Sequence, residues 1–133
     1  MSKIIRKISK FSFTELRDFV RSYPNIFRGH SENVSQNTLF TFAKNRLTRR
    51  NVIIGGKGDN LTYDQVILKE LDMGIKIEYE HTKDYWKAVD ITFDHLAEIP
   101  DYNSRLNRLE YKGENYWKGK NRQKIIDKKN GVY

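Results

Sequence analysis

The sequence predicts an α+β protein: a small single domain of four or five helices around a small sheet, with basic N- and C-terminal arms. Three observations support this class. Helix-capping signals precede stretches with apolar residues at helical spacing. One segment, residues 75–80, alternates apolar and polar side chains as a strand does. Charge is divided into an acidic middle and two basic ends.

Size and composition limit the class of protein. With 133 residues, the chain has the length of one domain with a modest core. Its aromatic content of 13% argues against disorder throughout. The chain contains no cysteine, which excludes disulfides, cysteine–zinc sites and a cysteine nucleophile. Because no apolar run approaches ~18 residues, we expect no membrane-spanning helix and no membrane partner.

The charge pattern divides the chain into three parts. Residues 1–54 hold 11 Lys and Arg against 3 Asp and Glu, residues 55–110 hold 7 against 12, and residues 111–133 hold 7 against 2. We interpret these parts as a basic helical N-terminal region, a strand–helix domain and a basic C-terminal arm. Two basic ends with interleaved aromatic residues predict contact with a polyanion or an acidic protein surface, although solubility alone explains either end by itself.

Two helices are expected in the N-terminal region. Ser12 and Glu15 have capping-box spacing, and Pro24 ends the apolar stripe that follows them. A second helix is expected from about Gln36 to Arg49, with a basic C-terminal end.

The segment between this helix and the strand contains a short apolar run, a glycine-rich loop and a further helix. Residues 51–54 fit a strand, and residues 55–60 lack the spacing of a phosphate-binding loop, so we interpret them as a flexible turn. Thr62 and Gln65 have capping-box spacing, which predicts that a helix begins here. Gly74 is expected to end that helix, as a C-terminal glycine does.

After the strand, Thr82 is expected to cap a long amphipathic helix that stops at Pro100. Its spacing puts Ala88, Val89 and Leu96 on the inner face. The expected outer face holds Lys87, Asp90, Asp94 and Glu98. A final helix carries Tyr102, Leu106 and Leu109 at amphipathic spacing.

The corner between strand and helix collects the residue types that bind metals or transfer protons. These residues are Glu78, Glu80, His81, Asp94 and His95. Imidazole and carboxylate groups together suit zinc, manganese or an acid–base pair. The spacing of the two histidines matches no established ligand pattern, so we favour a structural corner locked by hydrogen bonds and expect no cofactor. No serine or acid pair has the context of a hydrolase, which disfavours an enzyme.

Two groups of basic residues are the candidate polyanion-binding sites. The first lies at the end of the second helix and consists of Lys44, Arg46, Arg49 and Arg50. Complementarity to the helix dipole is the alternative explanation for these four residues. The second lies in the C-terminal arm, with Tyr116 and Trp117 as stacking residues beside Lys118, Lys120, Arg122, Lys124, Lys128 and Lys129.

Several short motifs follow one another between residues 55 and 110. They are the glycine pair 55–56, Gly-Ile-Lys-Ile-Glu-Tyr-Glu-His-Thr within residues 71–82, Asp-His-Leu-Ala-Glu at 94–98, Pro-Asp-Tyr at 100–102, and Leu106. This pattern resembles a domain family of unknown function that is common in tailed-bacteriophage genomes. Asn103 stands where that family is expected to have a second tyrosine, and Ile99 where an acid is expected.

The resemblance implies a phage or prophage origin, often among head and packaging genes, and it transfers no activity. With the basic ends, it leads us to expect a non-enzymatic virion structural or head-associated accessory protein. Such a protein would belong to an oligomeric assembly in the virion, and to the host cytoplasm during assembly, with other virion subunits and DNA as partners. One alternative is an early phage protein that binds nucleic acid or blocks a host-defence protein. The other is a small metalloenzyme that uses His81 and His95.

Overall fold

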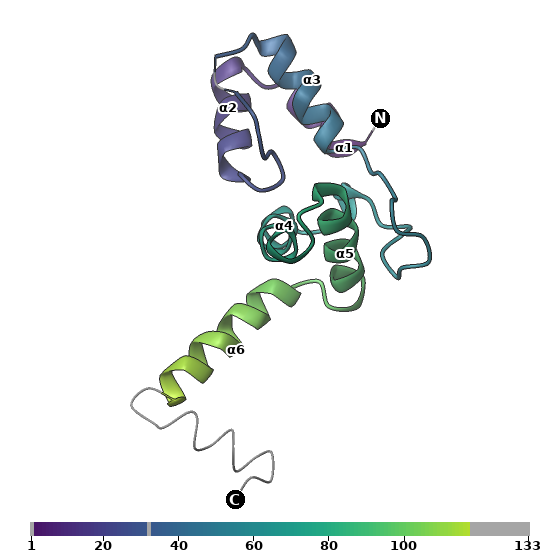
Figure 1. The fold of residues 1–133 in the computed structure, drawn as a ribbon. Helices are drawn as coiled ribbons and strands as arrows, with labels where there is room; N and C mark the ends of the chain where they lie inside the picture. Colours follow the sequence, from purple (N-terminus) through teal and green to yellow (C-terminus); the bar gives the residue numbers. More distant parts are fainter. Residues whose placement is uncertain (1, 32, 118–133) are drawn as a thin grey trace, which may run out of the picture. The chain divides into compact units, whose positions relative to one another are not determined.

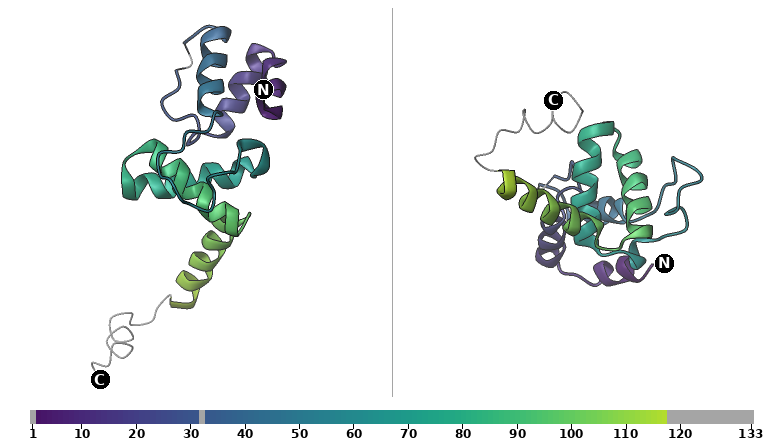
Figure 2. Two further views of the ribbon diagram at one scale, coloured as in Figure 1. Left: turned by 90° about the vertical axis from the view of Figure 1, so that its right-hand side faces the viewer. Right: turned by 90° about the horizontal axis from the view of Figure 1, so that it is seen from below.

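The computed structural model describes residues 2–31 and 33–117, and all regular structure in these residues is helical. Figure 1 shows the helices and Figure 2 gives two further views. Their bounds are α1 (Lys3–Ser9), α2 (Phe13–Ser22), α3 (Gln36–Arg46), the 3-10 helix η1 (Tyr63–Gln65), α4 (Leu68–Thr82), α5 (Tyr85–Glu98) and α6 (Tyr102–Trp117). The chain divides into two compact units, residues 1–102 and 103–133.

The predicted α+β class is wrong, because residues 75–80 form the second half of α4 and the described residues contain no strand. The alternation of these residues also fits a helix. Leu71, Ile75 and Tyr79 are spaced one helical turn apart, and the first two are buried. A six-residue alternating run cannot distinguish the two periods, and packing against α5 decides for the helix. The strand expected at residues 51–54 is likewise a loop.

The helices predicted between Ser12 and Pro24, from about Gln36 to Arg49, between Thr82 and Pro100 and from Tyr102 onward are confirmed in position, with shifted ends. The Ser12–Glu15 capping box is present, with Ser12 Oγ accepting from Glu15 N at 3.1 Å. The Thr62–Gln65 capping box is also present, with Thr62 N donating to Gln65 Oε1 at 2.9 Å, but it caps the 3-10 helix η1. Gly74 is a buried residue inside α4 rather than its end. Thr82 ends α4, and Asp84 caps α5 by accepting from Lys87 N at 3.1 Å.

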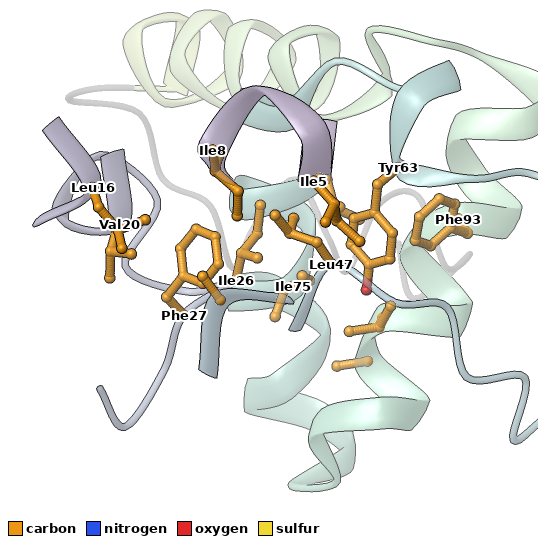
Figure 3. Close-up of a cluster of buried hydrophobic side chains, with 14 of the residues drawn as sticks. Ile5, Ile8, Leu16, Val20, Ile26, Phe27, Leu47, Tyr63, Ile75 and Phe93 are labelled. Atoms are coloured by element: carbon orange, nitrogen blue, oxygen red, sulfur yellow. The ribbon is translucent and has the colours of Figure 1, made fainter. Parts of the chain in front are cut away.

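One apolar core joins α1 to α5 in residues 1–102. Ile5 and Ile8 of α1 belong to one cluster of buried side chains that also holds Val20 of α2, Ile75 of α4 and Phe93 of α5, as Figure 3 shows. Ile26 and Phe27, in the loop after α2, are fully buried in the same core. The basic region 1–54 is therefore folded together with the acidic helices α4 and α5, which lie side by side. None of the helices in the described part of the chain is long and apolar enough to cross a membrane.

Candidate functional site

Asp72, on α4, holds the loop that follows α2. Its Oδ1 accepts from Asn25 N and Ile26 N, both at 2.8 Å, and its Oδ2 accepts from Asn25 Nδ2 at 3.0 Å. The carbonyl of Ile26 in turn accepts from Tyr85 Oη at 2.6 Å and Arg46 Nη1 at 3.2 Å. Every polar group named here has a partner, which is the condition for burying it at low cost.

Asp90, on α5, anchors the segment after α3. It is 1% exposed, although its spacing suggested an outer, solvated face. Its Oδ1 accepts from Arg49 Nη2 at 3.1 Å, and its Oδ2 accepts from Val52 N at 2.6 Å and Ile53 N at 2.9 Å. Arg49 also donates to the carbonyls of Gly58 and Leu61 and lies over the Phe93 ring. This is a buried ion pair whose two partners are both tied to backbone.

The glycine-rich loop, residues 55–60, is fitted against α5 rather than left flexible. Gly58 N donates to Asp94 Oδ1 at 2.8 Å, and Gly55 N donates to Asp59 Oδ2 at 2.7 Å. A Cβ at Gly58 would lie 2.7 Å from Asp94 N and closer still to the Phe93 carbonyl. The N–H groups of Gly55 and Gly58 thus donate to the protein's own carboxylates, and the loop packs against α5.

The Lys57–Glu98 pair adds an exposed contact beside this loop. Lys57 Nζ lies 2.6 Å from Glu98 Oε1. The hydrogen bond and charge of Glu98 raise the pKa of Lys57, and Lys57 lowers the pKa of Glu98 in the same way. Because both side chains are in solvent, the pair contributes little to stability.

Asp64, in the middle of η1, completes a set of four carboxylates with the same role. It accepts from Lys3 N and Ile4 N, both at 2.9 Å, and so caps α1 together with Ser2. Asp64, Asp72, Asp90 and Asp94 all belong to the acidic segment, and all accept backbone amides from residues 3–58. We call these four residues the carboxylate framework. Part of the acidic charge therefore serves the fold, because Asp64, Asp72 and Asp90 accept backbone amides of the basic segment.

The predicted basic group at the end of α3 does not form one outward patch. Arg46 lies over the Tyr85 ring and donates to Ile26 O, and Arg49 belongs to the Asp90 site. Lys44 and Arg50 are exposed, and Arg50 lies over Trp86. Polyanion binding by these four residues stays a prediction, but the guanidinium groups of Arg46 and Arg49 are directed inward.

A further basic surface, outside the two predicted groups, lies on α1. The exposed side chains Lys3, Arg6, Lys7 and Lys10 recur at i, i+3, i+4 and i+7, and with Phe11 they line an open depression. None of these four side chains forms an ion pair with a described residue. The signal in the sequence is the buried pair Ile5 and Ile8, which directs the cations to the opposite side of the helix.

The predicted histidine corner is built from two helices, not from a strand and a helix. His95 Nε2 lies 3.4 Å from Glu78 Oε1, and its ring stacks on Tyr102 at 4.4 Å between centroids. His81 and Glu80 are exposed at the end of α4, and Asp94 serves the glycine-rich loop. Residues 2–31 and 33–117 contain no group of three His, Cys, Asp or Glu placed to hold a metal ion.

The predicted C-terminal site lies mostly outside the described residues. Tyr116 is on α6 and exposed, and Trp117 is its last residue. Lys118, Lys120, Arg122, Lys124, Lys128 and Lys129 all lie beyond it, outside the described residues.

The comparison with known families matches residues 32–112 to DUF5661, a family described as a protein of unknown function. The chain belongs to the DUF5661 family. The matched region is longer than the predicted 55–110 and includes α3, all four framework carboxylates and the glycine-rich loop. Helices α1 and α2 lie outside it. No curated protein and no solved structure matches the chain.

Proposed function

We propose that this protein is a non-enzymatic bacteriophage protein that acts by binding, as a virion or head-associated component in contact with DNA. The observation that carries the DNA contact is the basic face of α1, formed by Lys3, Arg6, Lys7 and Lys10. The phage origin is supported by the resemblance of the motifs between residues 55 and 110 to proteins encoded by tailed phages. DNA packaged in a head is the polyanion that this origin makes available.

The dimensions of the α1 face suit a duplex backbone. Seven residues of helix span about 10 Å, and the same length of duplex axis carries about six phosphate charges. Four exposed cations on one side of a short helix can therefore each approach a phosphate without bending the DNA. No base-reading element is needed for this contact, so we expect binding without strong sequence preference.

The anchoring of α1 makes this face a fixed surface. Ile5 and Ile8 are buried, and the first turn is held by Asp64 and Ser2. A helix fixed at both its apolar side and its N-terminus presents its cations without the ordering cost of a flexible arm.

The test compares two double variants with equal loss of charge. Arg6→Gln/Lys7→Gln alters the α1 face, and Lys69→Gln/Lys76→Gln alters two exposed lysines of α4. Binding of a fluorescent duplex is measured by anisotropy across a series of salt concentrations. We expect the α1 variant to reduce the slope of log K against log salt by about 2. Equal slopes for both variants would refute the α1 contact.

The virion assignment has its own test. Mass spectrometry of purified particles, from a phage that encodes this protein, should detect it with a defined copy number. Its absence from particles would contradict a virion role and favour the early, intracellular alternative.

A further inference from the structure

Helix α6 carries a stripe of residues with a strict heptad repeat. At intervals of four, three, four and three residues it holds Tyr102, Leu106, Leu109, Gly113 and Tyr116. All five lie in one uninterrupted helix (Figure 1). A seven-residue repeat averages about 3.5 residues per turn, which keeps one face of a helix against a second helix along a left-handed supercoil. In this repeat Leu106 and Gly113 occupy a positions, and the other three residues occupy d positions.

The middle and the end of this stripe are exposed. Tyr102 stacks on His95 at the start of the helix. Leu106 is partly buried, whereas Leu109 is 68% and Tyr116 is 61% exposed. The helix also contains several weak helix formers, namely Asn103, Ser104, Asn107, Gly113 and Asn115. A helix of this length and composition is marginal in water and gains most of its stability from packing of an apolar face. Packing of the second half of α6 along the stripe would supply that stability.

The charged residues that flank the stripe complement those of a second copy in parallel orientation. Arg105 occupies a g position, and Glu110 occupies the e position of the next heptad. In a parallel pair each g residue faces the following e residue of the other helix, so Arg105 of each chain faces Glu110 of the other. In an antiparallel pair g residues face g residues instead. Arg105 would then face Arg105 or Lys112 of the other chain, and like charges would meet.

We propose that α6 of one copy of this protein pairs with α6 of a second copy as a parallel two-stranded coiled coil. The same surface serves on both chains, so the contact is isologous and closes as a dimer. The stripe spans two heptads, fewer than the three to four of a self-sufficient coiled coil. We therefore expect weak association that depends on protein concentration. The proposal goes beyond the DNA contact and does not rest on it.

The first experiment uses the absence of cysteine from the chain. Leu109→Cys places a thiol at a d position, where the two chains of a parallel pair meet at the same level. Tyr111→Cys is the matched control, because Tyr111 is also 68% exposed but lies on the opposite side of the helix. With oxidised glutathione as oxidant, we expect Leu109→Cys to form disulfide-linked dimers several-fold faster than Tyr111→Cys. Equal rates for the two variants would overturn the proposal.

The second experiment tests the parallel orientation by charge reversal. Arg105→Glu and Glu110→Arg proteins are studied alone and as a mixture, by sedimentation at high protein concentration. Alone, each variant places like charges at both contacts between e and g positions, so we expect several-fold weaker association than in the parent protein. In the mixture each reversed residue faces an opposite charge, so association should return as a dimer with one copy of each variant. A mixture that associates no better than the separate variants would overturn the proposal.

The third experiment strengthens the contact instead of weakening it. A Cβ at Gly113 would meet no other atom within 4 Å, so Gly113→Leu fits the chain and fills an a position of the stripe. It should lower the Kd of the dimer by about tenfold or more. Asn115→Leu adds the same side chain on the outer side of α6 and should leave the Kd unchanged. An equal gain for both variants, or a Gly113→Leu protein that stays monomeric, would overturn the proposal. All three experiments are done without nucleic acid, so their failure would leave the proposed DNA contact untouched.

Discussion

Two basic regions of this molecule, α1 and the end of α3, have similar composition but opposite roles in the structure. At the end of α3, Arg46 and Arg49 donate to backbone carbonyls, lie over aromatic rings and, in the case of Arg49, pair with a buried carboxylate. On α1, Lys3, Arg6, Lys7 and Lys10 are exposed around an open depression. The partner of a cation, rather than its place in a basic run, therefore determines whether the cation serves folding or binding.

The physical origin of this difference is the position of the acidic residues. Asp90 and Asp72 project from α5 and α4 toward the segments that flank α3, and their desolvated oxygens need donors. The only framework carboxylate at α1 is Asp64, which accepts backbone amides and leaves the lysine and arginine side chains unpaired.

The largest effect is expected from breaking the Asp90 site. Asp90→Ala leaves the Arg49 guanidinium and two backbone amides without their acceptor in a buried place, so the free energy of unfolding should fall by about 3–5 kcal/mol. Chemical denaturation followed by circular dichroism measures it. Asp18→Ala, at an exposed position of α2, is the matched control and should stay within about 0.5 kcal/mol of the parent. A small loss at Asp90 would mean that this carboxylate does not hold the segment after α3.

The next effect is expected at the glycine-rich loop. Gly58→Ala would push the loop from the backbone of α5, because the new methyl group would overlap the Phe93 carbonyl and Asp94 N. We expect a loss of about 1–3 kcal/mol in the free energy of unfolding. Gly56→Ala should lower the free energy of unfolding by less, because the added methyl group would contact the carboxylate of Asp94, which can rotate away. A larger loss for Gly56→Ala than for Gly58→Ala in the same denaturation assay would show that the loop does not pack against α5.

A smaller effect, on DNA binding rather than on stability, distinguishes the two basic regions directly. Arg6→Gln/Lys7→Gln should weaken duplex binding about thirtyfold at low salt and leave the melting temperature unchanged, because each of the two lost cations is worth ~1 kcal/mol near a polyanion. Arg46→Gln/Arg49→Gln should lower the melting temperature and leave the salt slope of the folded protein unchanged. Anisotropy titrations and thermal melts on the same preparations give both quantities. A loss of salt slope in the second variant would assign DNA contact to the α3 end as well.

The smallest effect compares two tyrosines of the core, Tyr63, which is buried, and Tyr85, which is partly buried. Tyr85→Phe removes the hydrogen bond to Ile26 O and should cost about 1 kcal/mol. The Tyr63 hydroxyl is buried and makes no hydrogen bond with the described residues, so Tyr63→Phe should be neutral or slightly stabilising. Denaturation curves of the two variants, recorded together, give the difference. Equal losses would indicate that Tyr63 has a bound partner such as a buried water.

The same tyrosines predict sensitivity to alkali. Burial raises the pKa of both Tyr63 and Tyr85 above the value of about 10 that tyrosine has in an unfolded chain. The unfolded state therefore releases these protons first, so stability is full below pH ~10 and declines as the pH rises above it. Thermal melts between neutral pH and pH ~11 should show this decline, and it should be reduced in Tyr63→Phe/Tyr85→Phe. An equal decline in the double variant would assign the alkaline transition to other groups.

Part of the candidate site could be predicted from the sequence, and part could not. The residue types alone predict a basic N-terminal region. They also predict that Asp94 and His95 form hydrogen bonds or ion pairs. The burial of Asp90 was not, because helical spacing put it beside Lys87 and Asp94 on an apparent outer face. Its burial depends on a loop 37 residues earlier in the chain that covers this face of α5.

The sequence by itself determined the local features of this protein. The Ser12–Glu15 capping box, the approximate helices from Gln36 to Arg49, between Thr82 and Pro100 and from Tyr102 onward, and family membership all follow from residues close together in the chain. Only the tertiary structure decided that residues 75–80 are helical and that Arg46 and Arg49 turn inward while the cations of α1 face solvent. The reason is that capping and periodicity act over a few residues, whereas the carboxylate framework joins groups 36 to 61 residues apart, and no local pattern records such pairings.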